Sequence, residues 1–380
     1  MRSVSVVGIG QIPVKKHYEI DLVQMGARAT RLAMDDAGVE QVDALYVGNM
    51  MADELQNQKH LGALIADAAG LVGVEALEAG AASAAGAAAL RLGYLAVASG
   101  DLDLVAVLGV EKMSEGAAVP ALSKALDGKL EVPIGATMIS RNAELMQMYM
   151  QAYDVPEDAF VNFAVNAHNN GRHNPNALFR KRVSARKVRN SRVVSGPLRL
   201  YDASPLCDGA AAVILAPTEQ ARAFSQHPVK MLSCTVATDH FRIEDRPNPL
   251  WLQAAENSAR EAMLRANVHL NDIDIFEVHD AFSIMATLQL EAAGFAEPGE
   301  GWKLAADKAI YRRGKVPIAT MGGLKARGHP IGATALYQTC EIVLQLTGRA
   351  GKNQVKKADV AIMQSVGGAA ATMLTHIFSN

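Results

Sequence analysis

One pattern occurs twice in this chain, first as ARATRLAMDDAGVEQVDALYVGN (Ala27–Asn49) and again as ENSAREAMLRANVHLNDIDIFEVHD (Glu256–Asp280), and it decides the fold. Each copy has an alanine-rich stretch with helical spacing, a short turn and an apolar run of strand length. A second pair follows in the same order, GAAALRLGYLAVASGDLDLVAVLGVE from Gly86 and GATALYQTCEIVLQLTG with ADVAIMQSVGG from Gly332. Although helix–strand alternation is common, two matched pairs in one order indicate a duplicated β-α-β plan.

The expected strands are apolar almost throughout, which is typical of parallel sheets that helices cover on both faces. We therefore expect an α/β protein with a first half over residues 1–226 and a second half over residues 227–380. Between Glu111 and Tyr201 the repeat is interrupted, and an inserted domain is expected over about residues 112–200. A polar stretch near Gln226–Val229 is the expected linker.

Composition excludes several classes of protein. The 380 residues are half hydrophobic and carry a formal charge of −2, so no global field favours nucleic acid or an anionic membrane. Three scattered cysteines without a CxxC motif predict neither disulfides nor a metal site. The apolar stretch Ala76–Gly100 contains Glu78 and Arg91 and is too charged to predict a membrane span. The N-terminal run is read as a strand, not a signal peptide, so a cytoplasmic location is expected.

The stretch GGLKARGHPIGAT (Gly322–Thr334) carries the first candidate site residue, His329. Pro330 and Gly332 favour a tight turn into a helix. Beside that helix N-terminus, where backbone N–H groups favour negative charge, an imidazole can act as a base or stabilise an oxyanion. A histidine that only caps the turn is the alternative.

Two further candidates follow expected strands. His279 ends DIFEVH, and the carboxyl end of a buried strand is where open α/β sheets place their sites, although a structural histidine would fit as well. The glycine-rich turn Ser365–Gly368 follows the strand VAIMQ. Glycines there permit close approach of a ligand, and successive N–H groups can bind an anion.

Motifs along the whole chain, taken together, resemble the thiolase superfamily. In chain order they are GIGQIP, LGVEKMS, HNNGRHNPNALF, PLRLYDASPLCDGAAAVIL, VHDAF, GGLKARGHPIGAT and SVGGAA. They resemble most the subgroup of sterol-carrier-protein thiolases and archaeal acetyl-CoA acetyltransferases. The resemblance implies a five-layer αβαβα fold of two similar halves with an inserted loop domain, a homodimer or homotetramer, and coenzyme A thioesters as substrates without a covalently bound cofactor.

The same resemblance implies roles for single residues. In thiolases a cysteine in a C-A-S-G type motif takes the acyl group, the histidine of a GHP motif activates it, and a second cysteine in a C-x-G motif moves the α-proton. By resemblance His329 is the GHP histidine, and His279 lines an oxyanion hole with it. Gly367 would supply an amide to a second oxyanion hole.

Both cysteines are missing from this chain. The segment GAASAAG (Gly80–Gly86) is read with Ala81 at the position of the nucleophile and Ser83 at that of the motif serine, while Ser365 stands at the second cysteine. Alanine cannot form an acyl-enzyme, and a serine hydroxyl is a poorer acid–base group than a thiol. Ordinary Claisen or thiolysis chemistry is therefore not expected.

Three functions remain open. The first is an acyl-CoA enzyme that works without covalent catalysis, such as a retro-aldolase on β-hydroxyacyl-CoA with a small zinc-ribbon/OB-fold partner of the DUF35 type. His279, His329, Gly367 and Tyr337 would then supply the base and the oxyanion hole. The second is an acetyl-CoA acetyltransferase whose nucleophile was replaced by divergence or engineering. The third is a non-catalytic acyl-CoA-binding or scaffolding subunit, against which the retention of both histidines argues.

Overall fold

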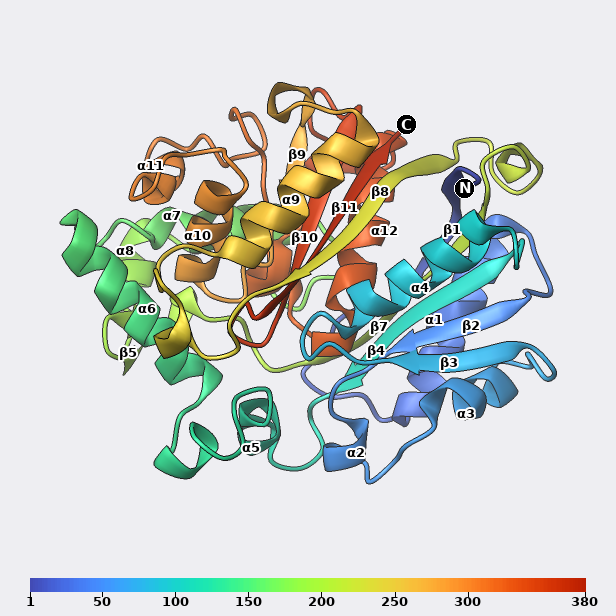
Figure 1. The fold of residues 1–380 in the computed structure, drawn as a ribbon, viewed down its shortest axis with the longest axis horizontal. Helices are drawn as coiled ribbons and strands as arrows, with labels where there is room; N and C mark the ends of the chain where they lie inside the picture. The colour runs from blue at the N-terminus through green and yellow to red at the C-terminus, as the bar shows by residue number, and fades with distance from the viewer.

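The computed structural model describes residues 1–380 and contains two halves with the same strand order (Figure 1). Nine strands are hydrogen-bonded in the order β3-β2-β4-β7-β1-β8-β11-β10-β9. In the first half they are β1 (Val4–Gln11), β2 (Ala44–Gly48), β3 (Glu75–Ala79), β4 (Val105–Lys112) and β7 (Asp208–Pro217). In the second half they are β8 (Val229–Thr238), β9 (Ile275–Glu277), β10 (Val360–Gly367) and β11 (Thr372–Ser379).

Strand pairing confirms the duplication. The series β2-β4-β7-β1 has one parallel and two antiparallel pairs, and β9-β10-β11-β8 has the same pairs in the same order. The halves join where β1 pairs antiparallel with β8 through Val4–Val6. The strands are thus mixed in direction, whereas covered apolar strands favour a parallel sheet. The short turn between β10 and β11 explains part of the difference, because a tight turn joins strands only in antiparallel order.

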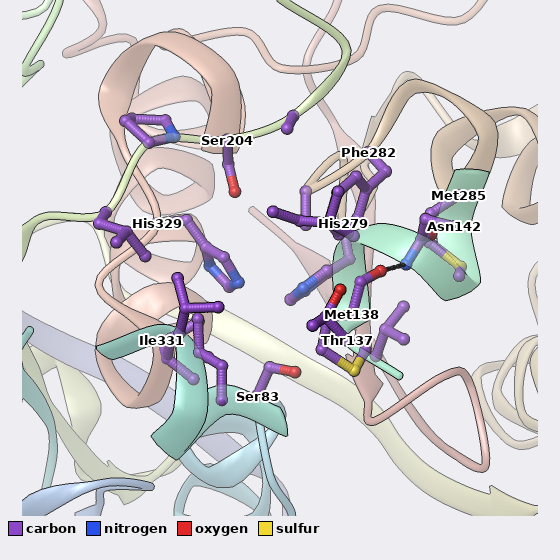
Figure 2. Close-up of a pocket in the computed structure, with 18 of the residues that line it drawn as sticks. Ser83, Thr137, Met138, Asn142, Ser204, His279, Phe282, Met285, His329 and Ile331 are labelled. Atoms are coloured by element: carbon purple, nitrogen blue, oxygen red, sulfur yellow. Dashed lines mark hydrogen bonds between the residues drawn. The ribbon is translucent and has the colours of Figure 1, made fainter. Parts of the chain in front are cut away.

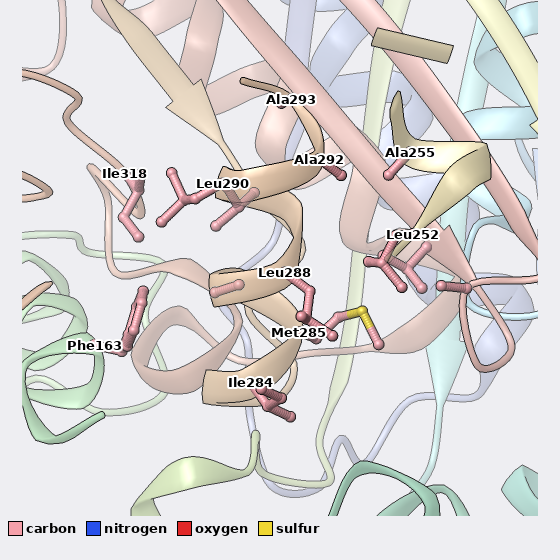
Figure 3. Close-up of a cluster of buried hydrophobic side chains, with 14 of the residues drawn as sticks. Phe163, Leu252, Ala255, Ile284, Met285, Leu288, Leu290, Ala292, Ala293 and Ile318 are labelled. Carbon is pink, nitrogen blue, oxygen red and sulfur yellow. The ribbon is translucent and has the colours of Figure 1, made fainter. Parts of the chain in front are cut away.

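Helices form three layers around these strands, so the fold has five layers. Helices α1 (Leu22–Ala37) and α3 (Leu61–Ala68) cover the outer face of the first half. Helices α4 (Ala85–Ser99) and α12 (Thr334–Leu346) lie in the middle and pack against strands of both halves. Helices α9 (Gln253–Ala266) and α10 (Ser283–Ala292) cover the outer face of the second half (Figure 3).

Local sequence explains where the matched outer helices end. Asp21 caps α1 by accepting a hydrogen bond from the backbone N–H of Gln24 at 2.7 Å, and Gly38 ends the helix with a left-handed φ of 66°. In α9 the left-handed residue is Asn267, with φ 52°. Glycine and asparagine are the residues that adopt this conformation at least cost.

The stretch between β4 and β7 holds the inserted region over the second half (Figure 1). Its elements are α5 (Ala118–Ser123), α6 (Met138–Tyr153), α7 (Val161–Gly171), α8 (Ala185–Arg189), β5 (Val193–Ser195) and β6 (Leu198–Arg199). A capping box begins α6, because the Thr137 and Ser140 side chains each bond the other's backbone N–H. Helices α6 and α7 share the core of α9 and α10, so the insertion is anchored to the second half.

Short elements complete the chain. They are the helices α2 (Ala52–Leu55) and α11 (Gly301–Ala306), a π-helical turn at Gly323–Arg327, and 3-10 turns at Val132–Ile134, Leu200–Asp202, Ala221–Ala223, Ile243–Asp245, Leu270–Asp272, Ile331–Ala333 and Gly351–Asn353. The sequence boundary after residue 226 lies in the connection from β7 to β8.

The middle helices meet at their N-termini through glycine. A Cβ atom on Gly86 of α4 would lie 2.4 Å from the carbonyl oxygen of Gly332, just before α12. Around α4, the segment Ala82–Ser99 is long and apolar enough to cross a membrane by length and composition, and half of it is buried. Since α4 lies in the middle layer between the two halves, its apolar surface is that of a core helix.

Candidate active site

A mostly apolar cavity of about 160 Å³ lies where the N-terminal side of α4, the turn before α12, the end of β9 and the inserted region meet (Figure 2). Twelve of its twenty lining residues are hydrophobic, so polar groups inside it are few and are poorly hydrated. The large apolar side chains include Met113, Leu122, Met138, Phe282, Met285 and Ile331. The polar side chains are Ser83, Thr137, Asn142, Ser204, His279 and His329.

His329 lies on the turn before α12, and its ring has a partner on that helix. Its Nδ1 is 2.7 Å from the Thr334 hydroxyl, which lies 3.5 Å from the carbonyl oxygen of Pro330. When that hydroxyl donates to Pro330, it accepts from the Nδ1–H of His329. The other ring nitrogen, Nε2, then carries a lone pair and can take a proton.

His279 follows β9, and its backbone is fixed by one side chain of α10. The Gln289 amide accepts from the backbone N–H of His279 at 3.0 Å and donates to its carbonyl oxygen at 3.1 Å. Nδ1 of His279 is buried without a hydrogen-bond partner. The ring stands edge-on to that of His329, with centroids 4.9 Å apart and planes at 89°. The structure therefore brings the two histidines predicted from sequence into contact.

Burial keeps both imidazoles neutral near pH 7. It lowers the pKa of His279 to about 3, and the positive charge of Arg327 acts in the same direction. It also holds the pKa of His329 well below its usual value, with His279 and Arg327 as further causes. Each neutral ring has one N–H donor and one acceptor nitrogen. The pair can thus donate to a developing oxyanion and accept a proton at the same time.

The structure corrects the position assigned to the missing nucleophile. Ser83, not Ala81, lines the cavity with the two histidines (Figure 2). Ala82 precedes Ser83 with a left-handed φ of 47°, and the N–H of Ala84 bonds the Ala81 carbonyl oxygen at 3.0 Å, so the chain turns sharply there. Ala81 lies outside the lining of the cavity, and its carbonyl oxygen faces Gly367 instead.

Spacing within the sequence contains the signal for this register. In the C-A-S-G type motif the cysteine lies three residues before the glycine, and SAAG (Ser83–Gly86) has the same spacing. Gly86 packs against Gly332, just before α12. By this spacing, and by its place in the cavity lining, Ser83 and not Ala81 corresponds to the cysteine of the motif.

The stretch Ser365–Gly368, at the end of β10, reaches the cavity, but through residues other than those expected. Val366 and Gly368 line the cavity, whereas Ser365 and Gly367 do not. The Ser365 hydroxyl is buried without a hydrogen-bond partner. A Cβ atom on Gly367 would lie 2.7 Å from the Ala81 carbonyl oxygen, so this glycine permits the turn of Ala81 to pack against β10.

Tyr337 and Cys207 are buried in the core. The Tyr337 hydroxyl donates to the carbonyl oxygen of Ile12 at 2.6 Å and accepts from the N–H of Ala210 at 3.1 Å, and the residue lies outside the cavity lining. Its suggested role in catalysis is therefore wrong. Burial raises the pKa of the Cys207 thiol to about 12, so Cys207 is no thiolate near pH 7, although its sulfur accepts a hydrogen bond from the backbone N–H of His329.

Glu111 is a site residue to which the sequence analysis gave no role. It is completely buried at the end of β4 and accepts hydrogen bonds from the N–H groups of Met50, Met51 and Gly332 and from the Asn49 amide. Burial raises its pKa to about 7 despite these donors. An acid directly after the apolar run VAVLGV was the available signal. Glu111 links the end of β2 to the turn that carries His329.

Side chains that could hold a metal ion are not grouped in this structure. No cluster of three or more His, Cys, Asp or Glu side chains is placed to hold a metal ion.

A basic segment, Arg172–Arg192, lies around α8 in the inserted region. Within it, Arg189 forms an ion pair with Asp158 at 3.0 Å. The other cations of this segment form no ion pair with a carboxylate.

Comparison with known proteins shows the family to which the chain belongs. Residues 4–219 match the model of the thiolase N-terminal domain, and residues 235–380 match that of the thiolase C-terminal domain-like family. An acetyl-CoA acetyltransferase of Methanothermobacter thermautotrophicus is 41% identical, with both chains covered completely. Sterol carrier protein 2 of Oryctolagus cuniculus is 30% identical over 98% of this chain and 71% of its own length. A solved structure described as an Ltp2–ChsH2(DUF35) aldolase superposes with a TM-score of 0.85 at 21% identity, covering 98% of this chain and 97% of that one. The chain belongs to the thiolase family.

Proposed function

We propose that this protein makes or breaks the carbon–carbon bond next to the thioester carbonyl of an acyl-CoA, and that it does so without a cysteine acyl-enzyme. One observation carries the proposal: two neutral histidine rings with centroids 4.9 Å apart face a mostly apolar cavity that has a serine at its α4 side and no cysteine in its lining. Retro-aldol cleavage of a β-hydroxyacyl-CoA needs a base and an oxyanion donor, which the two histidines supply, and it needs no covalent nucleophile.

The cleavage requires one base and one oxyanion donor. His329 Nε2 takes the proton of the β-hydroxyl group, the electron pair of the broken O–H bond forms the C=O bond of the new carbonyl, and the Cα–Cβ bond breaks. Its electron pair moves to the thioester enolate, whose oxygen accepts a hydrogen bond from the N–H of His279. The negative enolate offsets the cost of the transient imidazolium of His329. Return of the proton to Cα releases a shorter acyl-CoA and an aldehyde or ketone.

The relatives support this chemistry at two levels. The Methanothermobacter protein is described as an acetyl-CoA acetyltransferase, which favours acyl-CoA substrates for this chain. The structure described as an Ltp2–ChsH2(DUF35) aldolase shares the fold, and its description as an aldolase agrees with retro-aldol cleavage. By analogy we propose a DUF35-type protein as a partner, a homodimer or homotetramer as the assembly, and the cytoplasm as the location.

A second candidate function follows from Ser83. The hydroxyl lies at the N-terminal side of α4 and lines the same cavity as His329, which is where an acyl group would be taken by an acetyltransferase. A serine there could form an ester if a histidine removed its proton. Serine is a weaker nucleophile than cysteine at its free pKa, so we place this function second.

The test uses two substrates and four proteins (the wild type, His329→Ala, Ser83→Cys and Ser83→Ala), each alone and with a candidate DUF35-type partner. We expect the wild type to release aldehyde from a β-hydroxyacyl-CoA, and His329→Ala to lose about 10²–10⁴-fold in kcat. Acetoacetyl-CoA thiolysis should be absent from the wild type and appear in Ser83→Cys, since the thiol would stand beside the histidines.

The outcomes separate the hypotheses. Thiolysis by the wild type that Ser83→Ala abolishes would favour the acetyltransferase. Binding of acyl-CoA without turnover of either substrate, with or without the partner, would indicate a non-catalytic subunit and overturn the proposal.

A further inference from the structure

A second hollow in the molecule carries a concentrated positive charge. It is a groove of about 870 Å³, and only two of its thirteen lining residues are hydrophobic. Its single acid is Asp274, and its six cations are Arg312, Arg313, Lys315, Lys352, Lys356 and Lys357. Because the whole chain has a formal charge of −2, this excess of cations is local to the groove.

The groove lies at the edge of the second half opposite the two histidines. Its lining comes from residues 271–274, 312–317 and 352–357, and the first and last of these walls lead into β9 and β10. These strands are parallel, so their amino ends lie at one edge of the sheet, and His279 and Ser365–Gly368 lie at the other. No residue lines both the groove and the active-site cavity, so the groove is a separate site.

Most of the cations have no carboxylate partner. Lys357 forms an ion pair with Asp274 at 2.8 Å and lies 3.8 Å from Asp359, whereas the other five cations form no ion pair. Arg312 is half-buried and donates to the carbonyl oxygen of Lys352, which ties two of the walls together. Arg313 and the four lysines are exposed. An anionic ligand in the groove would thus be attracted by several cations at once.

The inserted region extends this positive charge. The Asn353 amide donates to the carbonyl oxygen of Asn170 at 3.0 Å, which places the third wall beside the end of α7 and the start of the basic segment. Burial and the positive charges of Arg172 and Lys352, among others, lower the pKa of His173. Cations of the groove and of the inserted region therefore lie around one place.

The lining favours one class of polyanion. It has no aromatic side chain, so the bases of a nucleic acid find no surface on which to stack. Its exposed lysines are point charges on flexible stems, which suit several separated charges better than one phosphate group held by fixed forks. A hollow also keeps its cations from the flat surface of a membrane. Carboxylates along an extended peptide meet all three conditions.

We propose that this groove binds an acidic segment of a partner protein through the cations of its three walls. The segment carries several Asp or Glu residues and needs no exact sequence, because exposed cations attract charge without fixing one geometry. Such binding is fast and sensitive to salt. The inference goes beyond the proposed function and does not depend on the reaction at the histidines, so either can fail without the other.

Binding of a fluorescently labelled peptide of ten glutamates tests the inference. By fluorescence anisotropy we expect the wild type to bind it at about 50 mM salt, and to bind it at least about tenfold more weakly at about 300 mM. Lys352→Glu/Lys356→Glu should weaken binding at least about tenfold, because like charges then face the peptide. The matched control Lys16→Glu/Lys230→Glu makes the same change in net charge with exposed lysines outside the groove, and it should weaken binding less than about threefold.

An absence of binding to the wild type would overturn the inference, as would an equal loss in the two double variants. Tighter binding of a ten-residue oligothymidylate, of polyphosphate or of anionic lipid vesicles, abolished by the groove variant, would also overturn it, since the groove would then serve another polyanion. Arg313→Glu/Lys315→Glu changes a different wall and should show the same loss as the first variant. Circular dichroism and the melting temperature check that the variants are folded.

Discussion

Glu111 accepts a hydrogen bond from the backbone N–H of Gly332 at 2.9 Å, three residues after His329. The same carboxylate oxygen, Oε2, accepts from the N–H of Met50, and Oε1 accepts from Met51 and from the Asn49 amide. Four N–H groups thus surround two oxygens, and no Lys or Arg forms an ion pair with them. The ionised carboxylate matches this set because it is acceptor-only. Glu111 therefore acts through the turn of His329 as a positioning residue.

Replacing Glu111 with glutamine should impair catalysis more than folding. In either orientation the new NH₂ group faces an N–H donor, so the turn that carries His329 must shift. A displacement of about 1 Å costs up to about 10²-fold in rate. We expect kcat of Glu111→Gln for the cleaved acyl-CoA to fall about ten- to a hundredfold, with KM changed less. Glu54→Gln is the control, because Glu54 pairs with Lys124 at the surface and should leave kcat unchanged.

The pH dependence of stability should identify the same carboxylate. Its pKa is raised from 4.5 to about 7 in the folded protein, so between these values the folded state holds a proton that the unfolded state releases. Stability from this group is therefore lost as pH rises through the window, by about 3 kcal/mol in total. Urea unfolding at pH 4.5, 6 and 7.5 should show the wild type losing this amount relative to Glu111→Gln. A constant difference between the two proteins would contradict the assignment.

Both active-site imidazoles should stay neutral in mild acid. With a pKa of about 3 for His279 and one well below the usual value for His329, neither ring gains a proton between pH 7.5 and 5. In protein with ¹⁵N-labelled histidine, the ring signals of these two residues, assigned with His279→Gln and His329→Gln, should not move over this range. The urea-unfolded protein is the control, since its histidines titrate near pH 6.5. Movement of either signal with a midpoint near 6.5 would show that the ring is hydrated.

The fold could be predicted from sequence because the duplication is written in local patterns. Helix, turn and strand recur in the same order along the chain, and the strands of the two halves pair in the same order. The strand directions could not be predicted as well, because apolar strands look alike whether their neighbours are parallel or antiparallel. His279 and His329 were found since each stands at the end of an element, where sites in this fold class are placed.

The remaining site residues depend on contacts that the sequence does not display. Ala81 and Ser83 differ by two positions in one small-residue stretch, and although the spacing to Gly86 was an available signal, it is the cavity lining that distinguishes them. Tyr337 has the spacing of a residue on the site side of α12, yet its hydroxyl is bonded to the backbone of β7 and of Ile12. Asn142 lies in an inserted helix that the repeat does not describe, so only the folded chain brings it to the cavity lining.

The contact of Gly86 with Gly332 makes a last prediction for the whole site. A Cβ atom on Gly86 would lie 2.4 Å from the Gly332 carbonyl oxygen and 2.8 Å from Leu336 Cδ2, and the carbonyl belongs to backbone that Glu111 holds. Gly86→Ala should therefore cost about 1–3 kcal/mol of stability and move the turn of His329 away from Ser83. Gly80→Ala is the matched control, because its Cβ would have no neighbour within 4 Å and its φ is not positive. Urea unfolding should show the loss for Gly86→Ala and almost none for Gly80→Ala. Equal stability of the two variants would mean that α4 and α12 can separate without cost and that this contact does not hold the turn of His329 in place.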